Sequence, residues 1–88
     1  SDVDMNGDIN SVKYIEHVLD LWSLDWYKQY RIKRFDIAYV AESHCGDVLN
    51  FYLEEEKEHT YAVRITKSNA LTTKEIEVVR CKLVFVKN

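Results

Sequence analysis

The chain has 88 residues, enough for one small domain, and carries a net charge of −3 with a pI near 5.5. Its 47% hydrophobic residues exclude a disordered tail, and its 31% charged residues are ordinary for a soluble surface. The acidic balance argues against nucleic acid as a partner. No apolar run approaches the roughly 18 residues of a membrane span. We therefore expect one compact domain.

The two cysteines, Cys45 and Cys81, are too few for a disulfide framework and match no zinc spacing. We expect a reduced, cytoplasmic protein without cofactor or metal, because small secreted domains usually carry more disulfide bridges. The chain opens at Ser1 inside a polar loop, with no initiator methionine, and reads as a piece of something longer.

A polar loop over residues 1–10, SDVDMNGDIN, precedes the first predicted element. Asn10 or Ser11 can cap a helix there, because their side-chain oxygens accept from the free amides of the first turn. Apolar residues at helical spacing predict a helix over about residues 10–22, with a turn or short helical extension over 23–30. The predicted buried stripe of the helix consists of Val12, Ile15, Val18, Leu19 and Trp22.

Four runs of alternating apolar residues after Tyr30 predict four strands. The polar segments 54–59 and 67–74 are expected to be hairpin connectors. One helix followed by four strands predicts an α+β domain, an antiparallel sheet with the helix laid across one face. The predicted inward residues are Phe35, Ile37 and Tyr39, then Leu49, Phe51 and Leu53, then Tyr61, Val63 and Ile65, and finally Val79, Cys81, Leu83 and Phe85.

The first loop is rich in side-chain oxygens, so a calcium site is one interpretation of it. Asp2, Asp4, Asn6 and Gly7 match the start of an EF-hand loop, D-x-[DN]-x-[DN]-G. The bidentate glutamate of the twelfth position is replaced by Lys13, whose charge would repel the metal. Calcium binding is therefore the weaker alternative.

A second interpretation places Asp4 and Asn6 at the N-terminal end of the helix. Free backbone amides and the positive end of the helix dipole can receive a developing oxyanion there. The two side chains, two residues apart in an extended loop, could orient a water molecule. A solvated capping loop is the structural alternative, and these ten residues taken alone favour it.

The loop, helix and first strand together resemble the C-terminal half of acyl-acyl-carrier-protein thioesterases. The shared pattern is approximately S-D-x-D-x-N-x-H-V-N-[NS]-x-K-Y-I, then a strand ending Y-x-x-E and a short turn. The match is close over about residues 1–50, while the last two strands agree only in pattern. The positions supplied here are Ser1, Asp2, Asp4, Asn6, Asn10, Ser11, Lys13, Tyr14 and Ile15, and later Tyr39, Glu42, Gly46, Asp47 and Leu49.

This resemblance implies a hotdog fold, in which a curved antiparallel sheet wraps around one long helix. It implies hydrolysis of a fatty acyl thioester carried by an acyl carrier protein. It also implies that residues 1–88 are the C-terminal hotdog of a double-hotdog protein, without the first strand of that fold. A second hotdog domain, either the N-terminal half or another copy of the chain, is then an expected partner.

By the same resemblance, the catalytic residues are Asp4, Asn6, Asp8 and Glu42. A carboxylate can activate water or hold the group that does, and the amide of Asn6 can orient the carbonyl. The structural alternatives are loop amides satisfied by Asp4 and Asn6, and a solvated strand-end charge at Glu42. Family members carry histidine where this chain has Asp8, and an ionised carboxylate cannot donate a proton. We therefore predict impaired hydrolysis with the fold retained.

Other candidates weigh less. His17 lies inside the predicted helix, where a partly buried or surface histidine is expected rather than a catalytic one. His44 and Cys45 are neighbours in sequence, but adjacent residues of an extended strand point to opposite faces, so no nucleophile pair is expected. Ser43 stands where some plant relatives have cysteine. The rival function is a non-catalytic hotdog module that pairs with another subunit, favoured by the replaced histidine.

Overall fold

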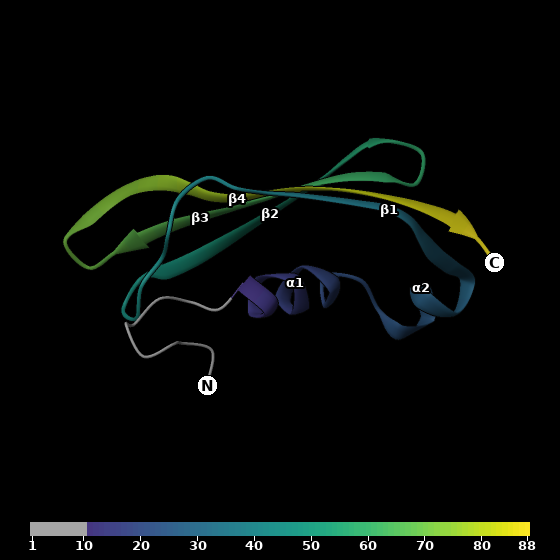
Figure 1. Cartoon of the computed structure of the whole chain (residues 1–88), viewed down its shortest axis with the longest axis horizontal. Helices are drawn as coiled ribbons and strands as arrows, with labels where there is room; N and C mark the ends of the chain where they lie inside the picture. The colour runs from purple at the N-terminus through teal and green to yellow at the C-terminus, as the bar shows by residue number, and fades with distance from the viewer. Residues whose placement is uncertain (1–10) are drawn as a thin grey trace.

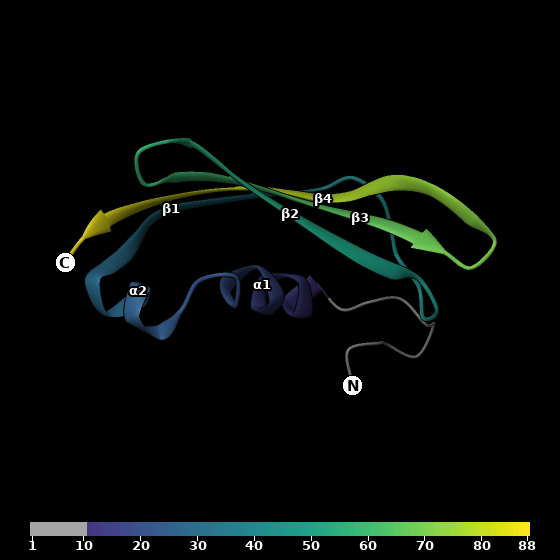
Figure 2. The same cartoon turned by 180° about the vertical axis from the view of Figure 1, so that it is seen from behind.

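The computed structural model describes residues 11–88, apart from the side chains of residues 72 and 73. The strands form one antiparallel sheet in the order β1-β4-β3-β2. Both helices lie on the same face of that sheet, below it in Figure 1 and in the reverse view of Figure 2. The expected α+β layout is confirmed. The elements are α1 (Ser11–Leu19), α2 (Leu24–Gln29), β1 (Tyr30–Tyr39), β2 (Val48–Lys57), β3 (Thr60–Asn69) and β4 (Thr72–Lys87).

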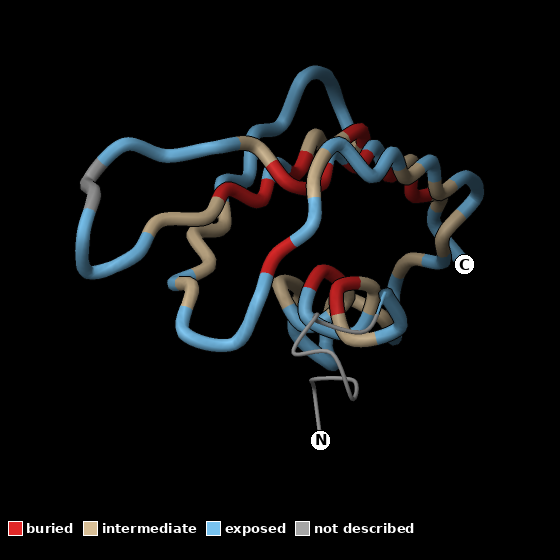
Figure 3. Tube along the Cα trace, turned by 60° about the vertical axis from the view of Figure 1, so that its left-hand side comes forward, coloured by how far each residue is buried: buried red, intermediate tan, exposed pale blue. Residues whose placement is uncertain are grey.

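The core lies between α1 and the sheet face that carries the alternating apolar residues. In the centre of the sheet, Val63 faces Cys81 and Ile65 faces Val79, and none of the four is more than 3% exposed. The tube in Figure 3 shows buried positions on the sheet and on α1 facing each other. The buried hydrophobic residues are Tyr14, Val18, Val63, Ile65, Val78, Val79, Cys81, Leu83 and Phe85.

The single helix predicted over residues 10–22 is wrong in its length. Residues 20–22 leave the helix, and Leu21 N donates to Val18 O at 3.1 Å, a bond that tightens the last turn of α1. A new helix, α2, begins after Ser23, whose hydroxyl accepts from Trp26 N at 3.1 Å and caps it. Neither helix of the described part is long and apolar enough to cross a membrane.

The buried stripe of α1 also differs from the predicted one. Tyr14 and Val18 are 4% and 0% exposed, whereas Val12 is 57% exposed. Residues four apart lie above one another on a helix, so Tyr14 and Val18 together define the face that packs on the sheet. Val18, Leu19 and Trp22 of the predicted stripe do pack in or against the core, so the prediction is wrong at Val12 and missed Tyr14.

The predicted connectors 54–59 and 67–74 are mostly strand. β2 continues to Lys57, so the turn consists of Glu58 and His59, and the β3–β4 turn consists of residues 70 and 71. The charged side chains of residues 54–57 are exposed while Glu54, Glu55 and Lys57 pair with β3, so their polarity does not end the strand. His59 has φ +59°, the left-handed conformation of a tight turn.

Two of the register shifts between paired strands change the alternation of buried residues. Lys33 is the extra residue of β1, and Val78 is the residue of β4 left out of the pairing with β3. A bulge bends its strand and increases the twist. The inward face therefore passes from Ile32 to Phe35 across the first bulge. At the second bulge, the consecutive residues Val78 and Val79 are both fully buried.

Candidate functional site

Glu42 is the predicted catalytic residue that falls within the described part of the chain. It is exposed, on the loop over residues 40–47 that connects β1 to β2. Asp4, Asn6 and Asp8 lie outside the described residues, as do the first residues of the calcium alternative. The candidate site is therefore described through the loop that carries Glu42 and the residues that contact this loop.

Two side chains hold this loop from different elements. The Tyr14 hydroxyl of α1 shares a hydrogen bond with Ser43 Oγ, and both residues are buried. The Lys67 Nζ of β3 donates to the carbonyl oxygen of Glu42. The Glu42–Ser43 peptide is thus held at its carbonyl by Lys67 and through the Ser43 side chain by Tyr14, while the Glu42 side chain is exposed.

Backbone hydrogen bonds fix the two ends of the same loop. At its start, the amides of Val40 and Ala41 both donate to the carbonyl of the bulge residue Val78, at 2.7 and 3.2 Å. Near its end, Asp47 Oδ2 accepts from His44 N at 2.9 Å, and Asp47 N donates to His44 O at 3.1 Å. These bonds set the direction in which the chain leaves β1 and presents Glu42.

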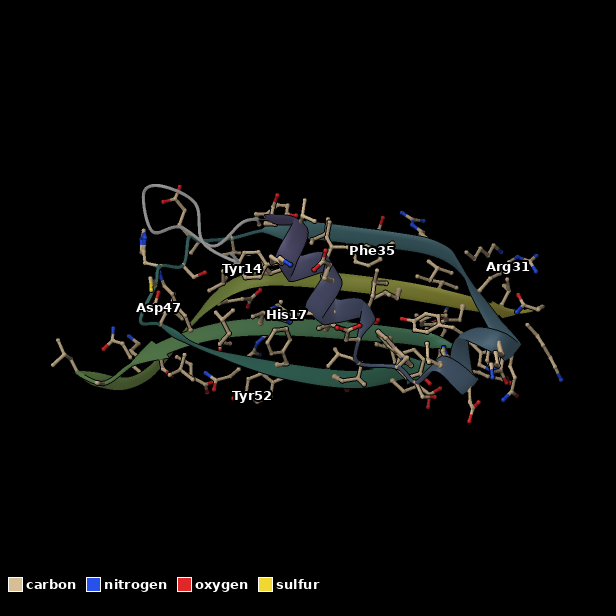
Figure 4. All side chains as sticks on the ribbon, turned by 90° about the horizontal axis from the view of Figure 1, so that it is seen from below. Tyr14, His17, Arg31, Phe35, Asp47 and Tyr52 are labelled. Carbon is tan, nitrogen blue, oxygen red and sulfur yellow. The ribbon has the colours of Figure 1, made fainter. Side chains whose placement is uncertain are left out.

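The loop lies at the end of the molecule where α1 begins. Figure 4 shows Tyr14 and Asp47 toward one end of the sheet and Arg31 at the other. The contact between Tyr14 and Ser43 places the loop against the first turns of α1. Glu42 and the start of the helix, which the sequence predicts to share a site, are therefore neighbours.

Two of these supports were not among the predicted site residues. Tyr14 belongs to the K-Y-I part of the family pattern, which was a usable signal. Lys67 lies in a segment predicted as a connector, and its contact with Glu42 joins residues 25 apart in the sequence. Periodicity gives no sign of such a contact.

The weaker candidates have structural roles or exposed positions. His17 is exposed on α1, and its ring meets Phe51 edge-on at 5.9 Å. His44 and Cys45 are both exposed in the loop, so the strand assumed for them is wrong. Cys81 is buried in the sheet, as expected of a small core residue, and burial raises the pKa of its thiol to about 11.

Metal-binding side chains do not gather within residues 11–88. No group of three or more His, Cys, Asp or Glu residues there is arranged to hold a metal ion. Lys13, which takes the twelfth position of the calcium pattern, forms an ion pair with Glu16 at 3.0 Å.

Comparison with known proteins decides the family. The sequence profile of the acyl-ACP thioesterase C-terminal domain matches residues 1–84. The chain belongs to this family. A crystal structure of an acyl-ACP thioesterase from Bacteroides thetaiotaomicron is similar to this thioesterase domain, with 42% identity and a TM-score of 0.84. The similarity covers 97% of this chain and 33% of that one.

More distant structures share the fold of this thioesterase domain. The 12:0-ACP thioesterase from Umbellularia californica is 20% identical, with a TM-score of 0.80 over 99% of this chain and 31% of its own. A 4-hydroxybenzoyl-CoA thioesterase is 13% identical, with a TM-score of 0.66 over 98% and 75% of the two chains. The domain has the hotdog fold of these enzymes. It spans about a third of the length of the two acyl-ACP thioesterases. Curated protein sequences gave no match.

Proposed function

We propose that this domain supplies catalytic residues for the hydrolysis of fatty acyl thioesters on an acyl carrier protein, releasing the free fatty acid. Membership of the family supports acyl-ACP as the substrate class. The observation that carries the proposal is the double support of the Glu42 loop by Lys67 and Tyr14. An exposed carboxylate on a fixed backbone suits a group that must stay in place to activate water.

In this mechanism Glu42 takes a proton from the attacking water as the water oxygen bonds to the thioester carbon. Asn6 orients the carbonyl, and Asp4 supports the water as a second carboxylate. The carbon–sulfur bond then breaks, and the leaving pantetheine thiolate takes up a proton from solvent or the one that Glu42 accepted from water. Asp8 stands where the family has histidine, and as an ionised carboxylate it cannot supply that proton. Turnover is therefore slow.

The domain works, in this proposal, as the C-terminal hotdog of a double-hotdog protein of cytoplasmic fatty-acid biosynthesis. The domain matches about a third of the length of the two acyl-ACP thioesterases, which supports a place within a longer protein. β1 and β2 are the edge strands of the described sheet, and each presents backbone groups that a second hotdog can cover. The partner is the N-terminal half or a second copy of the domain.

The rival is a non-catalytic hotdog that only pairs with another subunit, and Asp8 is the residue that favours it. The test measures free fatty acid after incubation with acyl-ACP, for the 88-residue chain alone and joined to an N-terminal hotdog of the family. Release that Glu42→Gln abolishes, at an unchanged melting temperature, supports catalysis. Glu54→Gln, which changes an exposed glutamate of β2, is the matched control. If the chain is folded but releases no fatty acid, either alone or joined to the N-terminal hotdog, the non-catalytic pairing module is the supported function.

A further inference from the structure

A buried hydroxyl lies next to each end of the contact between Lys67 and the carbonyl of Glu42. Ser43, directly after Glu42, is 2% exposed, and Thr66, directly before Lys67, is 1% exposed. They are two of the three buried polar residues in the described part of the chain. A buried hydroxyl needs a hydrogen-bond partner, and Tyr14 is the partner of Ser43. The partner of Thr66 is therefore the corresponding support on the side of Lys67.

That partner is the carboxylate of Glu75 on β4. Thr66 Oγ1 donates to Glu75 Oε1 at 2.6 Å, and the hydroxyl of Tyr52 donates to the same oxygen at 2.5 Å. Tyr52 belongs to β2, as Figure 4 shows. Asn50 Nδ2, also of β2, donates to Thr66 Oγ1 at 3.3 Å. One carboxylate oxygen thus joins three neighbouring strands of the sheet at Thr66.

We propose that Glu75 is a positioning residue for the hydrolysis: by holding Thr66, it fixes the segment of β3 from which Lys67 reaches the carbonyl of Glu42. This inference rests on the proposed function, since it concerns the orientation of the same catalytic loop. Neighbouring residues of a strand point to opposite faces of the sheet. A bond that holds Thr66 on one face therefore sets the direction of Lys67 on the other.

The backbone pairing between β3 and β4 is irregular at this place. Register shifts occur directly before Thr66 and after Lys67. Beyond the second shift, residues 73–75 of β4 lie opposite Ser68 alone, and Glu75 is one of these three. Extra residues of this kind interrupt the regular ladder of backbone hydrogen bonds. The side-chain bonds of Glu75 supply a connection between the strands where the ladder is weakest.

Glu77, two residues further along β4, shows how an ordinary surface carboxylate differs. It pairs with Arg80 at 2.6 Å and lies 3.9 Å from Arg64, and those side chains are 67% and 56% exposed. Exposed ion pairs of this kind contribute little to stability. Glu75 instead accepts from hydroxyls, and its removal would leave the buried hydroxyl of Thr66 without its acceptor. The bonds from Thr66 and from the second hydroxyl donor lower the pKa of the Glu75 carboxyl below its usual value, so it is ionised at neutral pH.

The test follows the NMR signal of the Glu42 carbonyl carbon in the 88-residue chain, because this signal moves upfield when the carbonyl loses a hydrogen bond. Lys67→Met removes the donor and gives the signal of the carbonyl without it. Glu75→Ala should move the signal most of the way to that value. Glu75→Gln should move it less, because its amide oxygen can still accept from hydroxyls. Glu54→Ala, the same change at an exposed glutamate of β2, is the matched control and should leave the signal in place. An unchanged signal in Glu75→Ala overturns the inference.

Changes at Thr66 show whether the effect depends on its hydroxyl. Thr66→Val keeps the shape of the side chain and should move the Glu42 signal as Glu75→Ala does, whereas Thr66→Ser keeps the hydroxyl and should not. Equal movement in both contradicts the inference. If thermal melts show that Glu75→Ala or Thr66→Val does not fold, Tyr52→Phe decides, because this side chain is 46% exposed and loses one hydroxyl without opening a cavity. A smaller movement in the same direction is then expected, and none overturns the inference.

Turnover separates positioning from stability. In the chain joined to an N-terminal hotdog of the family, Glu75→Ala should lower kcat by about tenfold and leave KM for acyl-ACP within about twofold, because a misplaced catalytic group slows the chemical step. A lower melting temperature at unchanged kcat indicates a merely structural role and overturns the inference. If the Glu42 signal moves but the wild type releases no fatty acid, the catalytic proposal alone is contradicted. If the wild type releases fatty acid and Glu75→Ala does so at the same rate, the inference alone is contradicted.

Discussion

The Tyr14 hydroxyl and Ser43 Oγ form a buried hydrogen bond between α1 and the β1–β2 loop. Ser43 is 2% exposed, and it is the only buried residue of the loop over residues 40–47. This bond therefore attaches the loop that presents Glu42 to the helix. The same hydrogen bond therefore contributes to the stability of the domain and to the position of the loop that carries Glu42.

Tyr14→Phe tests this attachment. It keeps the ring and leaves the buried Ser43 hydroxyl without this partner, so the free energy of unfolding should fall by about 1–3 kcal/mol. Urea denaturation at pH 7 measures the change. Tyr39→Phe is the matched control, because the Tyr39 ring lies 6.4 Å from that of Tyr14 but is 51% exposed, and a change within about 0.5 kcal/mol is expected.

A double-mutant cycle with Ser43→Ala separates the bond from other losses. Removing both hydroxyls should cost less than the sum of the two single changes, because neither partner is then left unsatisfied. Strictly additive effects would mean that the two hydroxyls do not interact in solution.

Val18→Ala tests which face of α1 packs on the sheet. Val18 is fully buried, and the loss of two methyl groups should destabilise the domain by about 1.6 kcal/mol or more, cavity included. Val12→Ala makes the same chemical change on the exposed side of the helix and should stay within about 0.5 kcal/mol of the wild type. Chemical denaturation compares the two. A larger loss from Val12→Ala would restore the stripe predicted from sequence.

The sheet could be predicted because alternation and pairing agree. Residues that alternate in sequence, such as Val63 and Cys81, face each other across β3 and β4 and are buried together. The helix break could not be predicted, because residues 20–22 contain no glycine or proline and the apolar spacing continues through Trp22. Its cause is tertiary: the Trp22 ring packs against Phe85 at 5.0 Å and Tyr61 at 5.3 Å.

Only the part of the site that belongs to the family's sequence pattern could be predicted. Glu42 follows from the spacing of the family pattern, and the structure places it on an anchored loop. The contact between Lys67 and the Glu42 carbonyl depends on where β3 lies relative to the loop. Local sequence does not reveal such a tertiary contact, because a lysine in a polar segment has the same sequence context whether or not it binds a distant carbonyl.

The stability of the domain should fall at alkaline pH because of Cys81. Burial raises the pKa of its thiol to about 11 in the folded state, above its usual value of 9.0. The unfolded thiol ionises first, so stability is complete below pH 9 and is lost between pH 9 and 11, by about 1–2 kcal/mol. Urea denaturation at pH 8 and pH 10.5 measures this loss. Cys81→Val should reduce the difference, and Cys45→Ser, at an exposed cysteine, should not.

At acid pH the ion pair of Glu77 should control part of the loss. The Arg80 guanidinium donates to Glu77 Oε1 at 2.6 Å and lowers the pKa of that carboxyl below its usual value. A lowered pKa contributes stability above the unfolded value and loses it as the pH falls through the folded value. Melting temperatures between pH 7 and pH 3 should therefore fall less steeply in Glu77→Gln and in Arg80→Gln. Slopes equal to that of the wild type would show that the pair does not form in solution.

Asp8→His tests whether the replaced histidine limits hydrolysis. Joined to an N-terminal hotdog of the family, the variant should release fatty acid from acyl-ACP about tenfold faster or more, because a positioned general acid–base group contributes at least that much. Its rate should also depend on pH near the histidine pKa of about 6.5, where the wild type shows no such step. Asp20→His adds a histidine at an exposed turn and serves as the control. An equal gain from Asp20→His, or none from Asp8→His, would remove position 8 from the mechanism and leave Glu42 to be tested alone.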